Sequence, residues 1–168
     1  MPIPDLLRLP AVLVPLPITE AFANLAYRRV LANHPQLFER LEAYRRCRFG
    51  FVPIDLPIAF VARPSENRIS AWRQPLPFNA VDVRVEAPFA VLLELLQGLA
   101  DGDALFFSRE IQVEGDMEAL LALRNALDDA RIDLVDDVFG KAGPLAPFLK
   151  TVMRHVTERQ SKEAGSWN

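Results

Sequence analysis

Few side chains in this sequence combine the types and the spacing that catalysis or metal binding needs. Cys47 lies in an arginine-rich stretch, residues 45–48, where positive neighbours can lower the pKa of a thiol and make it a nucleophile. A plain cysteine on a helix face is the alternative that we favour. His34 and His155 are far apart, no Cys, His or carboxylate group has metal-ligand spacing, and no G-x-S-x-G motif or glycine-rich phosphate loop occurs. The sequence therefore predicts a protein that is not an enzyme and holds neither a metal nor a cofactor.

The chemistry that the residues do suggest is burial of an apolar ligand. Apolar residues make up 51% of the chain and concentrate in segments 88–98, 117–129 and 144–159 and in the pair Phe106 and Phe107. Each of these residues, taken alone, is more often part of an ordinary hydrophobic core. Together, however, they provide more apolar surface than is needed to cover a small sheet. We therefore predict an apolar cavity between three neighbouring elements. The predicted lipid-binding residues are Phe89, Leu92, Leu93, Leu96, Phe106, Phe107, Leu120 and Leu127.

The hydrophobic pattern predicts the elements that position these residues. Two amphipathic helices come first, one beginning at Glu20 with Thr19 as its cap and one over 35–47. Short strands joined by turns follow. The clearest, VDVRVE, alternates between valines on one face and Asp, Arg and Glu on the other. The predicted strands are 49–55, 58–63, 68–72, 81–86 and 109–114.

Two further helices frame the last strand. The helix 88–98 is apolar almost all round, and only Glu94 and Gln97 are predicted to face outward. In the strand 109–114, Ile111 and Val113 point inward. Gly115 then ends the strand, and Asp116 caps a leucine-rich helix over 117–129. The order of helices and strands indicates an α+β fold.

At 168 residues, the chain has the size of one domain. We assign this domain to 19–135, preceded by a proline-rich apolar arm over 1–18 and followed by a C-terminal helix and tail over 136–168. The single cysteine fits a reducing compartment, and no signal peptide or membrane span is recognised. We expect a cytoplasmic protein, either free or peripheral at the inner face of the membrane.

Charge is segregated along the chain although the net charge is only -3. Residues 27–48 and 141–163 are basic, and residues 101–137 are acidic. Neither basic stretch interleaves aromatic residues at stacking positions, so nucleic acid is not an expected partner. The first stretch forms either a solvated helix face or a contact with an anionic membrane surface. Its arginines considered for that contact are Arg28, Arg29, Arg40, Arg45 and Arg46.

The C-terminal segment 144–159 is predicted to be a basic amphipathic helix. Its apolar face needs cover, either from its own domain, as a lid over the cavity, in a homodimer or in the membrane interface. The residues of this face are Leu145, Phe148, Leu149, Val152, Met153 and Val156.

The run DALFFSREIQVEGDMEALLALRNALD, residues 103–128, resembles the closing motif of sterol carrier protein type 2 domains. More closely, the chain resembles a branch of this superfamily, the bacterial accessory factors of oxygen-independent ubiquinone biosynthesis. That branch shares the proline-rich arm, the arginine-rich first helix and a D-x-D-x-L-F-F-x-R pattern. The pattern is matched by Asp101, Asp103, Leu105, Phe106, Phe107 and Arg109.

The resemblance implies a mixed five-stranded sheet covered by helices that enclose an apolar lipid tunnel, with Phe106 and Phe107 at its wall. It implies a prenylated quinone precursor as ligand and peptidase-like iron-sulfur hydroxylases as partners. Two alternatives stay open. One is a general phospholipid carrier, and the other is a non-catalytic scaffold that docks partner proteins through an apolar groove.

Overall fold

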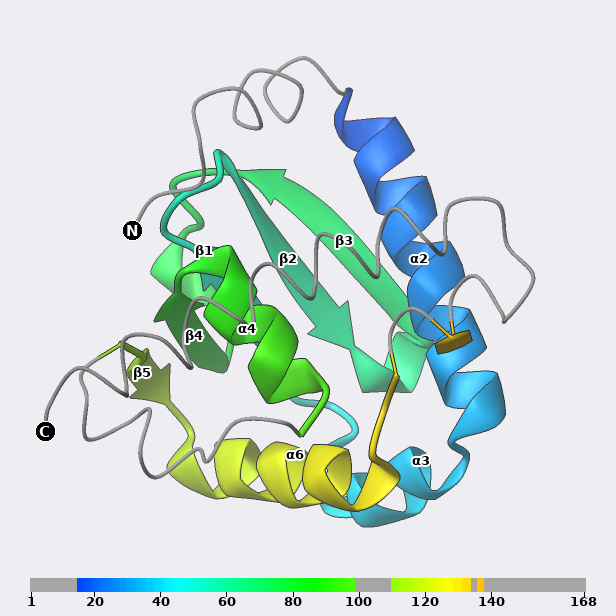
Figure 1. The fold of residues 1–168 in the computed structure, drawn as a ribbon. Coiled ribbons are helices and arrows are strands. Elements are labelled where there is room, and N and C mark those ends of the chain that lie inside the picture. The colour runs from blue at the N-terminus through cyan, green and yellow to red at the C-terminus, as the bar shows by residue number, and fades with distance from the viewer. Residues whose placement is uncertain (1–14, 99–109, 134–135, 138–168) are drawn as a thin grey trace, which may run out of the picture.

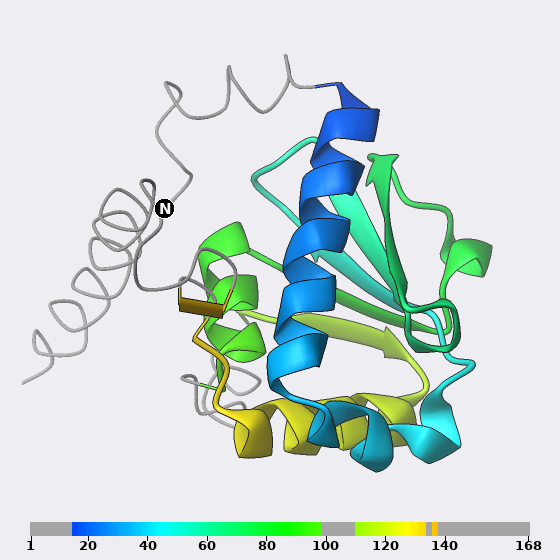
Figure 2. The ribbon, with the colours of Figure 1, turned by 90° about the vertical axis from the view of Figure 1, so that its right-hand side faces the viewer.

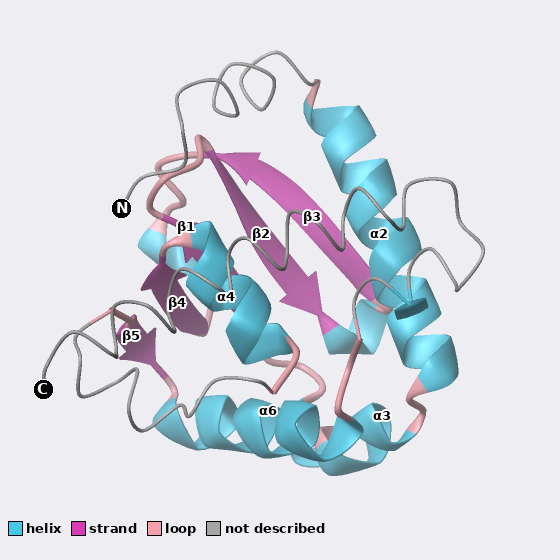
Figure 3. Ribbon diagram, viewed as in Figure 1, coloured by secondary structure: helices cyan, strands magenta, loops and turns pink. Residues whose placement is uncertain are grey.

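The computed structural model describes residues 15–98, 110–133 and 136–137. Within them the chain forms a five-stranded sheet in the order β3-β2-β1-β4-β5, with helices packed against it (Figures 1 and 3). β1 and β4 are parallel, and the other neighbouring pairs are antiparallel. The predicted α+β fold with a mixed five-stranded sheet is therefore confirmed. The strands are β1 Phe49–Pro53, β2 Ile58–Arg63, β3 Arg68–Arg73, β4 Val83–Ala87 and β5 Gln112–Gly115.

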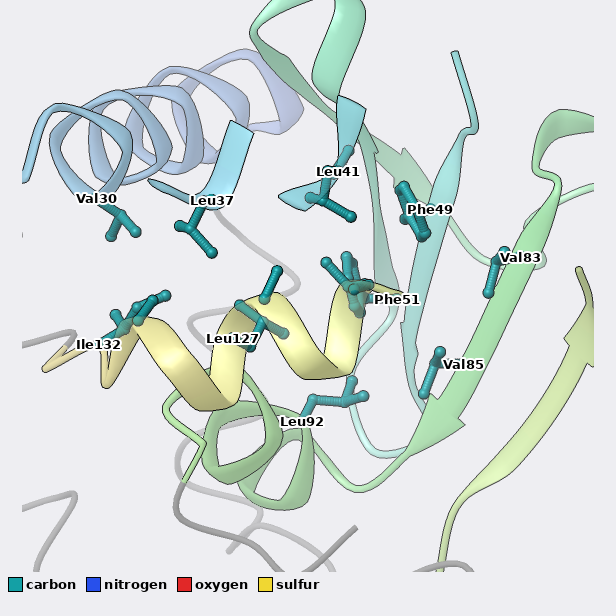
Figure 4. Packing of buried hydrophobic residues seen from close by; sticks show 14 of the residues in the cluster. Val30, Leu37, Leu41, Phe49, Phe51, Val83, Val85, Leu92, Leu127 and Ile132 are labelled. Carbon is teal, nitrogen blue, oxygen red and sulfur yellow. The ribbon is translucent and has the colours of Figure 1, made fainter. Parts of the chain in front are cut away.

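Helices cover one face of this sheet and one of its edges. The described helices are α2 Leu16–Asn33, α3 Gln36–Arg40, α4 Phe89–Leu96 and α6 Met117–Ala130, with short turns of 3-10 helix at Glu42–Tyr44, Pro64–Glu66 and Phe78–Ala80. The main core lies between the sheet and α3, α4 and α6 (Figure 4). Phe49 and Phe51 of β1 meet Leu41 and Leu127 there. This packing fixes α6 against the sheet.

The opposite face of the sheet is covered as well. The segment between β3 and β4 packs Leu76 against Val52, which forms a second, smaller core. Arg84, predicted on the face opposite the valines of its strand, is therefore only 8% exposed. Its guanidinium pairs with Glu86, donates to the carbonyl of Leu76 at 2.7 Å and lies 4.9 Å from the centre of the Phe78 ring. Arg84 thus lies on the face opposite Val83 and Val85, as the alternation predicts, but this second face of β4 is buried as well.

The first two helices differ from the prediction at their ends. α2 begins at Leu16 rather than Glu20, so the predicted arm ends inside a helix. Pro15 and Pro17 do not prevent this, because the first turn of a helix has no intrahelical partners for its N–H groups. The second predicted helix is shorter: α3 ends at Arg40 and a 3-10 turn follows.

α4 is buried even on its predicted outer side. Glu94 and Gln97, predicted to face outward, are only 6% and 7% exposed. The Gln97 amide donates to the Leu93 carbonyl at 3.2 Å, which satisfies one of its polar groups within the helix. The prediction of two outward residues is therefore wrong.

The junction between β5 and α6 follows the prediction closely. Gly115 has a φ of 102°, and a Cβ at this position would collide with the Asp82 carbonyl at the start of β4. Asp116 then caps α6 by accepting hydrogen bonds from the N–H groups of Glu118 and Ala119, both at 3.0 Å. The predicted break and cap are confirmed.

α2 lies along the outer edge of the sheet, beside β3 (Figure 2). Its polar side chains close this edge by hydrogen bonding. The Asn24 amide donates to the Ile69 carbonyl at 2.5 Å, and its oxygen accepts from the Ile69 N–H at 3.0 Å. Glu20 accepts from the Ala71 N–H at 3.1 Å and from Arg68 at 2.5 Å, and these contacts hold the pKa of Glu20 below its usual value. The helix thus supplies hydrogen bonds that a sixth strand would otherwise give, and protects β3 from pairing with another chain.

We expect Asn24→Ala to destabilise the protein by about 1 to 3 kcal/mol, because it leaves the two backbone groups of Ile69 without their partner. Urea unfolding followed by circular dichroism measures the effect. Asn125→Ala, at an exposed position of α6, gives the same gain in helix propensity without the contact. Equal stability of the two variants would contradict the edge-closing role of Asn24.

Candidate functional site

An apolar pocket of about 220 Å³ lies between α6 and the end of the sheet formed by β4 and β5. We call it the strand–helix pocket. Nine of its ten lining residues are apolar, and the tenth is Arg124. Such a pocket can hold a hydrocarbon group but offers no acid, base or nucleophile for catalysis. The lining residues are Val85, Leu95, Ile111, Val113, Met117, Leu120, Leu121, Leu123, Arg124 and Leu127.

The wall that β5 contributes follows from strand geometry. Ile111, directly before β5, and Val113 are two residues apart in extended chain, so both side chains point to the same side. Val85 of β4 pairs with Val113 and extends this surface.

Two rows of side chains on α6 form the other wall. The inner row, Leu120, Leu123 and Leu127, packs against the main core. The outer row has the i, i+4, i+7 spacing that places residues along one side of a helix. It consists of Met117, Leu121 and Arg124. Met117 and Leu121 are 51% and 55% exposed, and the side chain of Arg124 is 31% exposed. The outer row therefore marks the mouth of the pocket.

The eight predicted lipid-binding residues divide into three groups. Leu120 and Leu127 line the strand–helix pocket. Leu92 is buried in the main core and Leu96 packs against it, whereas Phe89 and Leu93 are half-buried outside the lining. The third group lies outside the described residues, together with the predicted apolar face of the C-terminal helix. This group is Phe106 and Phe107.

Several lining residues were not assigned to a site from the sequence. Ile111 and Val113 carried a usable signal, because their alternation predicted that both face inward. Leu95 carried no such signal, because α4 is apolar on almost every side. Arg124 was also missed, since a charged side chain is not an obvious part of an apolar wall.

A larger hollow of about 520 Å³ follows the outer side of α2. Its lining includes Glu20, Asn24 and Arg68, which already bond to one another or to the edge of β3. Because these polar groups hold the sheet edge, we consider the smaller strand–helix pocket the better candidate site.

The basic residues near the N-terminal helices have more acidic partners than their sequence neighbourhood suggested. Arg40 pairs with Asp129 at 2.5 Å and Arg45 with Glu42 at 3.3 Å. Arg28 and Arg46 are exposed. A contact of this surface with an anionic membrane stays a prediction.

Residues with catalytic potential do not gather in the described part of the chain. Burial, followed by the charges of Asp116 and Asp82, raises the pKa of the Cys47 thiol, opposite to what activation by arginines requires. His34 lies 2.8 Å from Asp137, where it ties the end of α2 to a later segment. Among the described residues no cluster of His, Cys, Asp or Glu can hold a metal ion.

The family model described as SCP-2 sterol transfer family matches residues 28–128, which include the five described strands and the whole lining of the pocket. The chain belongs to this family. No curated protein matches it by sequence.

Solved structures support the same fold. The structure of a UbiJ-SCP2 ubiquinone synthesis protein superimposes with a TM-score of 0.57 at 20% identity, covering 71% of this chain and 98% of that one. A crystal structure of sterol carrier protein 2 gives 0.50 at 16% identity, covering 67% of this chain and 95% of that one. The apo sterol carrier protein 2 from Yarrowia lipolytica gives 0.46 at 15% identity, covering 68% and 94%. The first two similarities show that this SCP-2 protein has the sterol-carrier fold.

Because its pKa is raised, Cys47 should hold less thiolate at neutral pH than an ordinary cysteine. We expect iodoacetamide to alkylate the native protein more slowly than the same protein in denaturant, as followed by mass spectrometry. Cys47 is the single cysteine, so both reactions report on one thiol. Faster reaction of the native protein would instead indicate an activated nucleophile.

Proposed function

We propose that this protein binds the apolar chain of a lipid in the strand–helix pocket and acts as an accessory factor in oxygen-independent ubiquinone biosynthesis. The observation that carries the proposal is the lining of the pocket, which is apolar at nine of ten positions. Each CH₂ group moved from water into such a site contributes about 0.8 kcal/mol. A lipid chain is therefore a better ligand for this pocket than a polar metabolite.

The pocket is small for a whole lipid. Its volume of about 220 Å³ lies below the range of roughly 300 to 1,000 Å³ that is usual for ligand pockets. We infer that the described walls hold one segment of a longer chain. Met117 and Leu121, both largely exposed at the mouth, offer apolar surface for the segment that follows.

Two observations support a quinone precursor as the ligand. One is the similarity in fold to the UbiJ-SCP2 protein, which is a ubiquinone synthesis protein. The other is the resemblance of residues 101–128 to the quinone branch of the superfamily. In this proposal the protein is not an enzyme: it keeps the prenyl tail out of water and presents the ring to peptidase-like iron-sulfur hydroxylases.

The proposal places the protein in the cytoplasm, at the inner face of the membrane from which such a lipid would come. No helix in the described ranges is long and apolar enough to cross a membrane. Exposed arginines near the end of α2 and after α3, such as Arg28 and Arg46, support an electrostatic contact with anionic lipids.

Organic extraction of the purified protein followed by mass spectrometry tests the proposal. Recovery of a prenylated quinone precursor supports it. Phospholipid alone would instead support the general lipid carrier, and a protein that carries and binds no lipid would support the docking scaffold.

We expect Leu120→Trp to fill the pocket and to lower the amount of co-purified lipid severalfold. The matched control is Leu25→Trp, which enlarges an exposed leucine in the larger hollow along α2. Circular dichroism checks that both variants fold. Loss of lipid from the Leu25 variant and not from the Leu120 variant would show that the lipid lies elsewhere.

A further inference from the structure

The two edges of the sheet are finished in different ways. At one edge, side chains of α2 bond to the backbone of Ile69 and Ala71 on β3. β5 is the outer strand at the other edge (Figure 1), and three of its four residues are exposed. An exposed outer strand presents unpaired N–H and C=O groups with which a further strand can pair.

The register of β4 and β5 shows which backbone groups point outward. The Val83 N–H donates to the Arg48 carbonyl at 3.2 Å, so Val83 bonds toward β1. Because this direction alternates along a strand, Arg84 bonds toward β5, where it lies opposite Glu114. The same alternation on β5 turns the N–H and C=O groups of Val113 outward. In the described part of the chain, no backbone hydrogen bond reaches this outer side of Val113.

The charges around this edge restrict what can pair with it. Residues 110–123 hold four acidic and no basic side chains. Glu114 is exposed, and the ion pairs between described residues do not include it. Arg84, opposite Glu114 on β4, already pairs with Glu86 and donates to the Leu76 carbonyl. Glu114 thus gives the outer strand a negative charge that the described residues do not pair.

A second copy of the chain is a poor partner for this edge. If two β5 strands paired antiparallel around Val113, Glu110 would lie opposite Asp116, and like charges directly opposite each other are destabilising. Exposed strands are commonly protected from unwanted pairing by charged side chains of this kind. That protection does not exclude a basic strand, because opposite charges across two strands stabilise the pair. Charge complementarity therefore favours an extended segment with basic side chains.

The two faces of an added strand would meet different surroundings. Side chains alternate between the faces of a strand, so those on the side of α6 would continue the apolar wall of Ile111 and Val113. Those on the other face would lie beside Gln112 and Glu114. The segment that suits this edge therefore alternates apolar and basic residues.

We propose that the outer edge of β5 is a docking site for a partner protein, which adds an extended segment of alternating basic and apolar residues to the sheet. The backbone of the segment bonds to Val113, and its basic side chains lie beside Glu114. Because β5 is also a wall of the strand–helix pocket, the partner is held next to the pocket. This docking site goes beyond the proposed function and does not depend on lipid binding.

The test measures the binding of labelled short peptides to the full-length protein by fluorescence anisotropy. The basic peptide alternates lysine and valine, and the acidic peptide has glutamate in place of lysine. The third is the basic peptide with methylated backbone nitrogens, which cannot donate to the edge. We expect the basic peptide to bind about tenfold more tightly than either of the others, since a few charge pairs or hydrogen bonds supply that factor.

Two charge-reversed variants assign the preference to β5. Glu114→Lys should remove most of the advantage of the basic peptide over the acidic one. Glu39→Lys is the matched control, because it makes the same change at an exposed position of α3. The neighbouring Arg40 pairs with Asp129, at the end of α6 that is farther from β5. The control should keep the full preference, and circular dichroism checks that both variants fold.

Amide hydrogen exchange followed by NMR locates the bound peptide. In the protein alone, the outward N–H of Val113 should exchange faster than that of Glu114, which bonds to β4. The basic peptide should slow the exchange at Val113. Protection of Val113 in the dilute protein alone would show that this chain covers its own edge. Protection that rises with protein concentration would show that a second copy does. Either result overturns the proposed partner.

The peptide measurements can also overturn the docking site. Equal binding of the three peptides, binding of none of them, or a preference that survives in Glu114→Lys would each do so. None of these results bears on lipid binding, which organic extraction tests separately.

Discussion

The junction between β5 and α6 is the constraint on which the rest of the structure depends. Gly115 adopts a φ of 102° and brings the chain against the Asp82 carbonyl, where a side chain would not fit. The Asp116 N–H donates to that same carbonyl at 3.0 Å, and the Asp116 side chain caps α6. Strand β5 is thereby held beside β4, and α6 must begin at one fixed place. Both walls of the strand–helix pocket, one from β5 and one from α6, therefore start at this junction.

α6 serves the core and the pocket with different residues. Ala119, Ala126 and Ala130 are buried, and such small side chains let the helix approach the elements beside it closely. Longer side chains, mainly leucines together with Arg124, occupy the side of α6 that lines the pocket. One helix therefore closes a solid core on one side and leaves a space on the other. In our proposal, this space takes up the hydrocarbon chain of the lipid.

Local signals in the sequence were sufficient for most of the fold. The Gly115 break, the Asp116 cap and the alternation of Ile111 and Val113 each depend on neighbouring residues, so they can be recognised without a structure. Arg84 could not be placed in this way, because its burial depends on Leu76 folding over the second face of the sheet. The start of α2 was missed because prolines in a first turn look like helix breakers.

The candidate site was partly predictable for the same reason. An amphipathic helix identifies its buried side, so Leu120 and Leu127 could be chosen. α4 is apolar on almost every side, and nothing in its sequence separates Leu92, which lies in the core, from Leu95, which lines the pocket. Only the packing of α4 beside α6 determines which of these leucines lines the pocket.

Photocrosslinking tests the central claim, that the lipid chain lies in the strand–helix pocket, most directly. A fatty acid with a diazirine in its chain is bound to the full-length protein and activated by light, and mass spectrometry then identifies the labelled peptides. The account predicts labels within residues 110–127, on β5 and the first turns of α6. Labels confined to residues 16–33, along the hollow of α2, would contradict it.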